Sequence, residues 1–420
     1  MKKIYTVAVI GLGGRGGDVY APLIFEKKDC FKIVALCDLN REKLSVFQNK
    51  FGLAADCCFS SEEEFFKEKR ADLLVIATPD TCHARQCLAA FALGYDVMTE
   101  KPLTDVKDEC EALLAAQKKY GGKALVCHVL RYAPAFIKAA EILNSGAIGQ
   151  LVAIDALERV QYAHQAHSYV RGNWRNRKLA APMILAKCCH DLDLLQFYAK
   201  SKCKSISSVG DLMHFKKENA PDGATEKCLD CPHVDTCAYS AKKNYLDLWE
   251  ASGKPDDCWP WNVIAQAPLT KEKILVALRE TNYGQCAYLS DNDVVDHQLT
   301  MMTFENGVKA TLTMTAFTAT GGRRMYFHGT HGELVLDEQD NTLRLHIYGQ
   351  DAILYPLSEL NEKGYGHGGG DAGLVNQLYD MLTGNTSQAT SLEASVESHL
   401  MGICAEESRL KGGELVYIHK

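Results

Sequence analysis

The sequence predicts an α/β fold in two domains: a parallel sheet covered by helices, then an α+β domain with an open, mainly antiparallel sheet. In the first half, short apolar runs alternate with helical patterns, as they do in βαβ units. In the second half, strand patterns follow one another through tight turns. We therefore expect a first domain at residues 1–128 and a second at 129–420, with residues 218–262 as a Cys-rich insertion.

Apolar periodicity places the elements of the first domain. The expected strands are 4–10, 32–37, 73–77, 95–99 and 124–129. The expected helices lie near 17–27, 41–50, 61–68, 82–93 and 105–119. Because each helix returns the chain to the start of the next parallel strand, the carboxyl ends of the strands should share one edge, where ligands bind in such sheets.

The second domain begins with an expected helix at about 133–144 and an alternating strand at 151–160. Further strands are expected at 205–214, 298–304, 308–317, 324–329, 332–336 and 342–347. The short connections 305–307 and 330–332 are tight enough for hairpins, which join antiparallel strands. Two helices, near 371–384 and 391–411, precede a last short strand.

A glycine-rich turn follows the first expected strand, in the order Gly11, Leu12, Gly13, Gly14, Arg15 and Gly16. Its pattern, G-x-G-x-x-G, is typical of a dinucleotide-binding Rossmann domain when a strand precedes it and a helix follows. Gly11 permits the tight turn, and Gly13 lets the backbone approach a pyrophosphate. Gly16 lets the helix pack close to the strand, and the free N–H groups of that helix point at the phosphates.

An acidic residue stands where such a domain needs one to bind ribose. Asp38 ends the second apolar run, about twenty residues beyond the last glycine of the turn. Its carboxylate can accept hydrogen bonds from the ribose hydroxyls, and it repels a 2′-phosphate. Arg41 lies close enough to pair with Asp38 or with such a phosphate. We therefore expect NAD as the cofactor, with NADP possible.

Two more loops at the same sheet edge carry polar side chains. Thr78, Pro79 and Asp80 follow the third expected strand, with His83 just beyond. Glu100 and Lys101 follow the fourth, before a proline. Because loops at the carboxyl ends of parallel strands build the ligand crevice, we expect Thr78, Pro79, His83, Glu100 and Lys101 to lie at the cofactor.

Composition excludes several other classes of protein. The 420 residues carry a formal net charge of −7, which argues against binding to nucleic acid or to an anionic membrane. No apolar stretch approaches the ~18 residues of a membrane span, and the first strand begins too early for a signal peptide. The 17 cysteines then suggest thiols in a reducing compartment, so we expect a cytoplasmic protein.

Nearly the whole chain resembles the glucose–fructose oxidoreductase/inositol dehydrogenase/MocA superfamily. The residues that carry the resemblance are the glycine turn, Asp38, Ala77–Asp80 with His83, Glu100-Lys101-Pro102, Arg131-Tyr132 and His190-Asp191-Leu192-Asp193. The resemblance implies a Rossmann domain followed by an α/β domain whose open sheet often serves oligomer contacts. It also implies a nicotinamide cofactor and a sugar, cyclitol or similar polyol substrate, in a homodimer or homotetramer.

The same resemblance implies roles for four residues. Lys101 matches the lysine that contacts cofactor and substrate, where an ammonium group would stabilise a developing alkoxide. His190 matches the acid–base histidine, which accepts the hydroxyl proton. Asp193 lies on the same helical face and is expected to bind substrate or to orient His190. Arg131 is expected at the substrate.

One departure from the family pattern concerns the histidine. Many members carry an aspartate four residues before it, whereas this chain has Ala186 followed by Lys187. If Lys187 faces the pocket, it and Lys101 lower each other's pKa, and a neutral Lys187 could share the proton transfer. Alternatively, Lys187 binds an anionic substrate group, or it forms a salt bridge with Asp191 or Glu100.

A basic and aromatic stretch precedes this helix. Arg171, Trp174 and Arg175, with Arg177 beyond, are expected to bind a carboxylated or phosphorylated sugar and to stack on its ring, and a solvated loop is the alternative. If the stretch is helical, Arg171 and Arg175 share one face. A glycine-rich segment later places His367 as a second substrate ligand, and Asp371 as a cap of the next helix.

The insertion carries a cysteine pattern typical of metal sites. Cys228, Cys231 and Cys237 are spaced as C-x₂-C-x₅-C, and Cys258 follows about twenty residues on. Four thiolates suit a structural Zn²⁺, and less well-supported alternatives are an iron–sulfur cluster or reduced cysteines without metal. His233 can replace Cys258. A metal would fold a segment that looks too polar to build its own core.

These observations favour an NAD(P)-dependent dehydrogenase that moves a hydride between nicotinamide and a secondary alcohol of a sugar, cyclitol or sugar acid. Two alternatives stay open. One is an NAD-dependent glycoside hydrolase that works by transient oxidation and elimination. The other is a non-catalytic dinucleotide-binding regulator, which the presence of both Lys101 and His190 disfavours.

Overall fold

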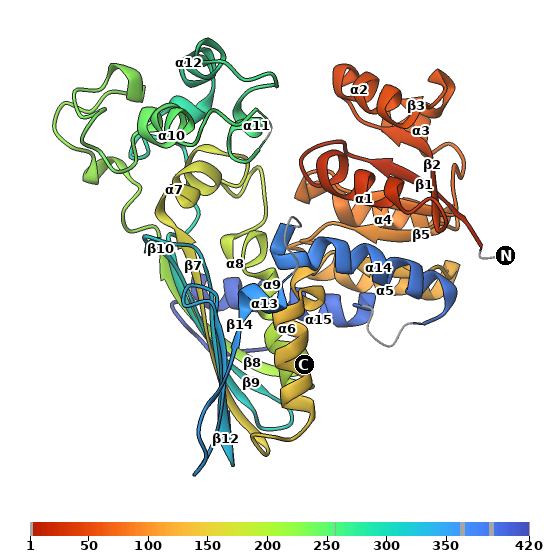
Figure 1. Cartoon of the computed structure of the whole chain (residues 1–420), viewed down its shortest axis with the longest axis vertical. Coiled ribbons are helices and arrows are strands. Elements are labelled where there is room, and N and C mark those ends of the chain that lie inside the picture. Colours follow the sequence, from red (N-terminus) through yellow and green to blue (C-terminus); the bar gives the residue numbers. More distant parts are fainter. Residues whose placement is uncertain (1–2, 257, 362–365, 386–389, 420) are drawn as a thin grey trace.

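The computed structural model describes residues 3–256, 258–361, 366–385 and 390–419. It confirms the predicted fold class (Figure 1). The first sheet has six parallel strands in the order β3-β2-β1-β4-β5-β6. The second has nine strands in the order β14-β13-β12-β11-β7-β10-β9-β8-β15, and among the described strands of this second sheet β7–β10 is the one parallel pair.

The Rossmann sheet follows the expected runs closely. Its strands are β1 (Tyr5–Ile10), β2 (Phe31–Cys37), β3 (Cys58–Phe59), β4 (Leu73–Ile76), β5 (Asp96–Thr99) and β6 (Ala124–Val126). Its helices are α1 (Ala21–Glu26), α2 (Arg41–Phe51), α3 (Glu62–Phe65), α4 (His83–Ala92) and α5 (Lys107–Tyr120). The structure adds β3, which the sequence did not predict because it pairs over only two residues of β2. One helical turn, Gly16–Tyr20, precedes α1.

Nine strands build the second sheet, which lies at the lower left of Figure 1. They are β7 (Leu151–Gln161), β8 (Cys203–Asp211), β9 (His297–Phe304), β10 (Lys309–Thr318), β11 (Gly322–Gly329), β12 (Gly332–Asp337), β13 (Thr342–Ile347), β14 (Ile353–Pro356) and β15 (Val416–Tyr417). Both predicted hairpins are confirmed, since β9 pairs with β10 and β11 with β12 in antiparallel register. Strand β14 was not predicted.

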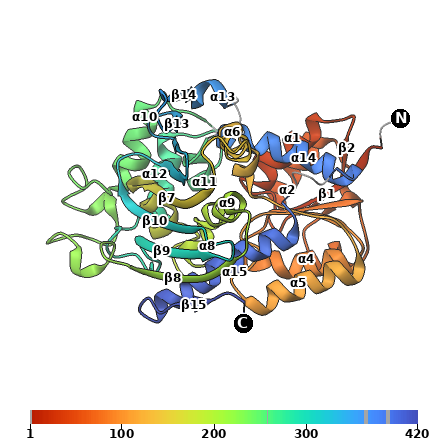
Figure 2. The same ribbon diagram turned by 90° about the horizontal axis from the view of Figure 1, so that it is seen from below.

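Helices fill the space between the two sheets. Figures 1 and 2 show α6, α9 and α15 on the side of the large sheet that faces the Rossmann domain. Their bounds, with those of the neighbouring short helices, are α6 (Pro134–Asn144), α7 (Tyr162–His164), α8 (Met183–Ala186), α9 (Cys189–Ala199), α13 (Leu357–Leu360) and α15 (Leu392–Leu410). The outer face of the sheet carries exposed apolar side chains instead, among them Val209, Leu299 and Met301.

Helix α14 (Gly370–Thr383) returns to the Rossmann domain from far along the chain. Leu374, Val375 and Leu378 join the buried cluster that contains Val7 of β1. Tyr5 also donates a hydrogen bond to the carbonyl oxygen of Leu382 at 2.8 Å. The core of the first domain is therefore completed by the second half of the chain, and the boundary at 128/129 stays a prediction.

The Cys-rich insertion forms a separate lobe, seen at the upper left of Figure 1. It contains α10 (Leu248–Ala251) and α11 (Trp261–Ile264), and α12 (Lys271–Glu280) packs against it. The expectation that this segment is too polar for a core of its own is wrong. Its aromatic residues bury a small apolar cluster with α12, and the members of that cluster include Tyr245, Trp249, Trp261, Ile274 and Leu278.

Within the described part of the chain, no helix has the length and apolar character that crossing a membrane requires.

Candidate functional site

The glycine turn has the geometry that the motif predicts. Gly11 has a φ of +89°, and a Cβ there would lie 2.5 Å from the carbonyl oxygen of Ala77. A Cβ at Gly16 would lie 2.0 Å from the carbonyl oxygen of Gly11. Both positions therefore require glycine. At Gly13 a Cβ would meet no heavy atom within 4 Å, so the backbone of the turn is open to an approaching group such as a pyrophosphate.

Asp38 sits against this turn at the end of β2. Its carboxylate accepts hydrogen bonds from the backbone N–H of Leu12 at 2.6 Å and of Asn40 at 2.8 Å. The side chain of Asn40 then caps α2 by accepting from the backbone N–H of Glu42 and Lys43. Arg41 is exposed on the first turn of α2. Turn and carboxylate thus form one rigid corner, as a ribose-binding site needs.

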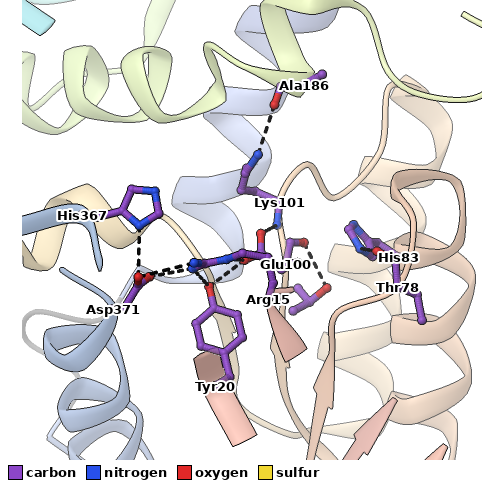
Figure 3. Close-up of polar contacts among 10 residues, drawn as sticks. Arg15, Tyr20, Thr78, His83, Glu100, Lys101, Ala186, His367 and Asp371 are labelled. Carbon is purple, nitrogen blue, oxygen red and sulfur yellow. Dashed lines mark hydrogen bonds and ion pairs between the residues drawn. The ribbon is translucent and has the colours of Figure 1, made fainter. Parts of the chain in front are cut away.

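Arg15 links three parts of the chain (Figure 3). Its guanidinium donates to Glu100 at 2.8 Å, to Asp371 at 2.6 Å and to the hydroxyl of Tyr20 at 2.5 Å. Tyr20 also donates to Glu100 at 2.6 Å. The glycine turn, the loop after β5 and the start of α14 are therefore held together by one polar cluster, in which Arg15 is partly buried and its three partners are buried.

Charge in this cluster fixes the state of its carboxyl groups. Burial raises the pKa of Glu100, but the charges of Arg15 and Lys101 outweigh burial and hold that pKa below its usual value. The same balance holds at Asp371, where His367 and Arg15 lower the pKa strongly. Asp371 was expected to cap α14. It pairs with Arg15 and His367 instead, and no side chain caps that helix.

His83 ties two crevice loops together. It is buried, with one ring nitrogen 2.7 Å from the carbonyl oxygen of Pro102 and the other 2.7 Å from that of Thr78 (Figure 3). The Thr78 hydroxyl donates to the side chain of Gln86 at 2.6 Å, while Pro79 is exposed. The structure thus shows His83 shaping the loops, with both ring nitrogens already engaged.

Lys101 projects from the loop after β5 toward the second domain. Its Nζ donates to the carbonyl oxygen of Ala186 at 3.1 Å (Figure 3). Burial lowers the pKa of Lys101, but the Cys189 thiol and the carboxylates of Glu100 and Asp80 outweigh burial and raise it. The expectation that Lys187 would lower this pKa is therefore wrong, and Lys101 stays an ammonium ion at neutral pH.

His190 is the second residue of α9 and is 8% exposed. Its Nδ1 is buried without a hydrogen-bond partner among the described residues. The rings of His128 and His367 lie 6.1 Å and 6.2 Å away between centroids. Burial lowers the pKa of His190 well below its usual value, and the positive charges of Lys101 and Arg323 lower it further. A neutral imidazole therefore stands close to a charged lysine.

Lys187 pairs with a carboxylate that the sequence analysis missed. Its Nζ lies 3.1 Å from Glu158 of β7, not beside Asp191 or Glu100 as expected. Arg323 of β11 lies 2.9 Å from the same carboxylate and 2.8 Å from Asp191. This network engages the Lys187 ammonium group, so the structure does not support a share in proton transfer or a free cation for substrate.

The missed residues did leave a signal in the sequence. On β7 the buried side chains alternate, and Glu158 falls on the core side with Ile154 and Ala156. On β11, Arg323 shares the core side with Met325. A charged residue at a core position of an alternating strand needs a buried partner of opposite charge. Glu158 and Arg323 form such an ion pair.

Asp193 and Arg131 bind each other. Asp193 is fully buried and accepts from Arg131 at 2.6 Å and 2.7 Å, a bidentate pair. The expectation that Asp193 orients His190 or binds substrate is not met, because its oxygens are occupied by Arg131. Buried His128 lies at 3.8 Å from Asp193, and burial lowers the pKa of His128 to about 4.

The basic stretch does not form an anion site. Arg171 is 1% exposed and donates to the carbonyl oxygens of Gln285 and Tyr239, both at 2.6 Å, inside the insertion. Arg175 pairs instead with Asp291 at 2.6 Å. The expectation that the two arginines share one ligand is therefore wrong, because Arg171 points to the backbone of Tyr239 and Gln285, whereas Arg175 points to Asp291.

Trp174 does lie at the crevice. Its indole N–H donates to the Asp80 carboxylate at 3.2 Å. Burial raises the pKa of Asp80, and the nearby positive charge of Lys101 opposes that rise only in part. His367, whose side chain is 40% exposed, lies near His190 on the opposite wall. Trp174 and His367 thus lie beside residues of the crevice, and their contact with substrate stays a prediction.

An aromatic contact at the mouth of the site comes from the insertion. The ring of Trp259, half exposed, lies 4.9 Å from that of His164, at the end of β7. Burial lowers the pKa of His164 far below its usual value, with Lys187 and Lys101 adding to the shift. His164 therefore stands near both lysines, and Trp259 packs against the His164 ring. In the sequence, the hint of this contact is that a Pro/Asp-rich insertion contains tryptophan.

The expected metal ligands are only partly brought together. Cys228, Cys231 and Cys237 line one cavity with Cys286, whereas Cys258 packs against the apolar cluster of the insertion. Among the described residues, no group of three or more His, Cys, Asp or Glu side chains is arranged to hold a metal ion as it stands. All 17 cysteines are described, and none forms a disulfide.

Comparisons with known proteins agree with this geometry. Residues 5–128 match the GFO/IDH/MocA family, described as "Oxidoreductase family, NAD-binding Rossmann fold". Over 414 residues the chain is 23% identical to YteT of Bacillus subtilis (strain 168), a protein named as an oxidoreductase, with 92% of this chain and 93% of YteT covered. It is 29% identical over 202 residues to an inositol 2-dehydrogenase of Rubrobacter xylanophilus, covering 48% of this chain and 54% of that one.

Solved structures share the whole fold at low sequence identity. A levoglucosan dehydrogenase in complex with NADH and levoglucosan matches with a TM-score of 0.69 and 18% identity, over 100% of both chains. An oxidoreductase from Agrobacterium radiobacter in complex with NAD+, L-tartaric acid and magnesium matches with a TM-score of 0.68 and 15% identity, over 99% of this chain and 98% of that one. Residues 5–128 therefore match the NAD-binding Rossmann domain of the GFO/IDH/MocA oxidoreductases, and the glycine turn has the geometry that this domain requires.

Proposed function

We propose that this protein is an NAD-dependent dehydrogenase that acts on a secondary hydroxyl of a neutral sugar or cyclitol. One observation carries the proposal: a charged Lys101 and a neutral His190 stand close enough at the end of the Rossmann crevice for the lysine to lower the pKa of the histidine. A hydroxyl that loses a proton and a hydride together needs both a base and a cation at its oxygen.

The residues of the Rossmann edge fit the cofactor. The open backbone at Gly13 and Gly14 would receive the pyrophosphate, and Asp38 would accept from the ribose. Arg15 and Glu100, joined at 2.8 Å, would hold the crevice floor beneath it. When bound, the nicotinamide ring takes up or releases the hydride.

His190 moves the proton in this proposal. Its buried Nδ1 has no partner among the described residues, so we assign the transfer to Nε2, which is not enclosed in the same way. As the substrate C–H bond gives up a hydride, the O–H bond breaks, its proton goes to Nε2, and the carbonyl forms. The Lys101 ammonium group stabilises the negative charge on the oxygen along the way.

The charges at the site favour a substrate without a formal charge. Lys187 and Arg323 are neutralised by Glu158 and Asp191, and Arg15 by Glu100 and Asp371. Among the described residues of the crevice, Lys101 forms no ion pair with a carboxylate, and in this proposal its ammonium group faces the reacting oxygen. Trp259 offers a half-exposed aromatic face, the kind of surface against which the C–H face of a neutral sugar packs. Names of relatives such as the inositol 2-dehydrogenase and the levoglucosan dehydrogenase support the same class.

Substrate-dependent reduction of NAD+ tests the proposal. The full chain is mixed with NAD+ and a panel of neutral cyclitols and hexoses, each beside its uronate or phosphate counterpart, and NADH absorbance is followed. Accumulation of NADH with a neutral polyol, lost in Lys101→Ala, supports it. Release of a sugar from a glycoside without net NADH would identify the hydrolase alternative instead, and NAD+ binding with no conversion of any panel member would point to the regulator.

The outer face of the large sheet supports self-association. Val209 and Leu299 are paired across β8 and β9, and Met301 lies on the same face at 62% exposure. An apolar sheet face of this kind is usually covered by a partner. We propose a homodimer or homotetramer through this face. Light scattering of wild type and Met301→Lys distinguishes it from a monomer, because a buried lysine opposes association.

A further inference from the structure

Four cysteines from two distant stretches meet at one small cavity in the insertion. Cys228, Cys231 and Cys237 come from the C-x₂-C-x₅-C motif, and Cys286 lies far beyond it in sequence. The cavity measures about 20 Å³. That exceeds the roughly 10–15 Å³ that one water molecule needs, so the space suits a single ion better than a multi-atom cluster.

Backbone pairing places Cys286 beside the motif. Lys227 forms an antiparallel bridge with Gln285, and the backbone N–H of Cys286 donates to the carbonyl oxygen of Glu226 at 2.8 Å. The Cys228 thiol lies 3.5 Å from the carbonyl oxygen of Gln285. Cys286 therefore faces the first motif cysteine because of a fixed backbone register, and not because of a flexible loop.

A buried cation without a carboxylate points into the same region. Arg171 is 1% exposed, its Nη2 lies 3.6 Å from the Sγ atom of Cys228, and its Nη1 has no hydrogen-bond partner among the residues that the structure describes. Among the ion pairs of the described residues, none involves Arg171, although most other buried arginines here pair with a carboxylate. An isolated buried charge is costly unless an anion compensates it. Thiolates at Cys228 and its neighbours would be that anion.

We propose that Cys228, Cys231, Cys237 and Cys286 bind one Zn²⁺ ion as four thiolates, with Arg171 as the buried counter-charge. Four cysteine ligands are typical of closed structural zinc sites. Binding releases the four thiol protons to solvent, and the resulting centre has a net charge of −2, which Arg171 partly offsets. The role of the site is structural, and it is independent of the proposed dehydrogenase activity.

The other candidate ligands are engaged elsewhere. His233 lines the cavity, but its Nε2 lies 2.8 Å from the carbonyl oxygen of Asp222. Cys258 packs with the apolar cluster of the insertion, away from the cavity lining. As they stand, these thiols do not form a group of three or more ligands that could hold a metal ion, and Cys228 donates a hydrogen bond to the carbonyl oxygen of Gln285. One rotamer step about χ1 moves an Sγ atom by about 3 Å, enough to turn it inward once it is deprotonated.

Metal content of matched variants tests the ligand set. The full chain, purified without added metal, should contain one zinc per chain by elemental analysis. Cys286→Ser should reduce zinc to less than about a tenth, whereas Cys258→Ser should retain it. Absence of metal from the wild-type protein overturns the proposal, as does iron with visible absorbance. Loss of zinc in Cys258→Ser with retention in Cys286→Ser overturns the assignment of the fourth ligand.

A measurement on the wild-type protein guards against variants that fail to fold. The holoprotein is alkylated with and without prior removal of metal by a chelator, and labelled cysteines are mapped by mass spectrometry. Increased labelling confined to Cys228, Cys231, Cys237 and Cys286 supports the site. Labelling of these four that is the same before and after chelation overturns it.

Discussion

The Nζ atom of Lys101 donates a hydrogen bond to the backbone carbonyl oxygen of Ala186 at 3.1 Å. Ala186 ends α8 and stands four residues before His190, at the position where the family resemblance implies an aspartate. A main-chain oxygen therefore fixes the lysine beside the histidine, and it does so without adding a negative charge. The positive charge of Lys101 remains available to a substrate oxygen and to the tuning of His190.

Removal of either group should abolish most turnover without loss of cofactor binding. We expect Lys101→Ala and His190→Ala each to lower kcat by roughly 10²–10⁴-fold, the usual contribution of a positioned acid–base or electrostatic group. The measurement is steady-state kinetics with a substrate found in the panel, together with NADH titration. Lys107→Ala, on the exposed first turn of α5, is the matched control and should behave as wild type. Turnover near wild type in either site variant would contradict the assignment.

The pH profile of oxidation should be flat around neutrality. His190 acts as a base in its neutral form, and its pKa lies well below 6.5, so the acid limb of kcat/KM should fall below that pH. The pKa of Lys101 is raised above 10.5, so its charge persists into the alkaline range. In Lys101→Ala, loss of a nearby positive charge should move the residual acid limb to higher pH. A limb at or above pH 6.5 in wild type would contradict the lowered pKa.

The Rossmann half could be predicted because its signals are local. The apolar run of β1 leads directly into glycines that the turn requires, and Asp38 follows at the end of β2. Contacts between residues that lie far apart in the sequence could not be predicted in this way. Glu158 reaches Lys187 from a strand of the second sheet, and α14 returns to complete the first core. The spacing of residues within β7 or α14 does not show which distant residues these elements contact.

The environments of Arg171 and of the motif cysteines were hard to predict for the same reason. The sequence predicts that Arg171 binds an anionic sugar, with a solvated loop as the alternative, yet the fold buries it against carbonyl oxygens of residues far along the chain. Spacing rules favour Cys258 as a fourth metal ligand because it is nearer in sequence. The register between Lys227 and Gln285 brings Cys286 to the motif instead.

The network beneath the site should be important for stability. Glu158 is fully buried and pairs with Lys187 and Arg323, so Glu158→Gln leaves two cations with one remaining carboxylate, Asp191. We expect a loss of about 3–5 kcal/mol in the free energy of unfolding, as is usual when one partner of a buried ion pair is removed. Urea denaturation measures it. Asp155 lies on the exposed face of the same strand, β7, and pairs with His328 of β11. Asp155→Asn is therefore the control and should lower the free energy of unfolding by no more than about 1 kcal/mol.

The fixed Asp38 carboxylate should determine the preference between NAD and NADP. Its carboxylate is fixed by the backbone N–H of Leu12 at 2.6 Å, where it repels a 2′-phosphate. We expect NAD to bind at least about tenfold more tightly than NADP, which corresponds to about 1.4 kcal/mol. Asp38→Ser should reduce that ratio, whereas Asp56→Ser, at an exposed position of the same domain, should not. Tighter binding of NADP to the wild-type protein, measured by titration, would contradict this prediction.

The insertion should contribute to substrate affinity through Trp259. Its half-exposed ring packs edge-on against His164, which stands near Lys101 and Lys187, so it lies where a sugar ring would enter. An aromatic contact of this kind contributes about 0.5–1.5 kcal/mol beyond area burial, so Trp259→Ala should raise the substrate KM roughly 2- to 10-fold. The KM for NAD+ should stay unchanged, and Trp259→Phe should restore most of the affinity because it keeps an aromatic face. If Trp259→Ala changes the KM of both ligands equally, or of neither, the ring does not contact the sugar, and the wall of the site ends at His164.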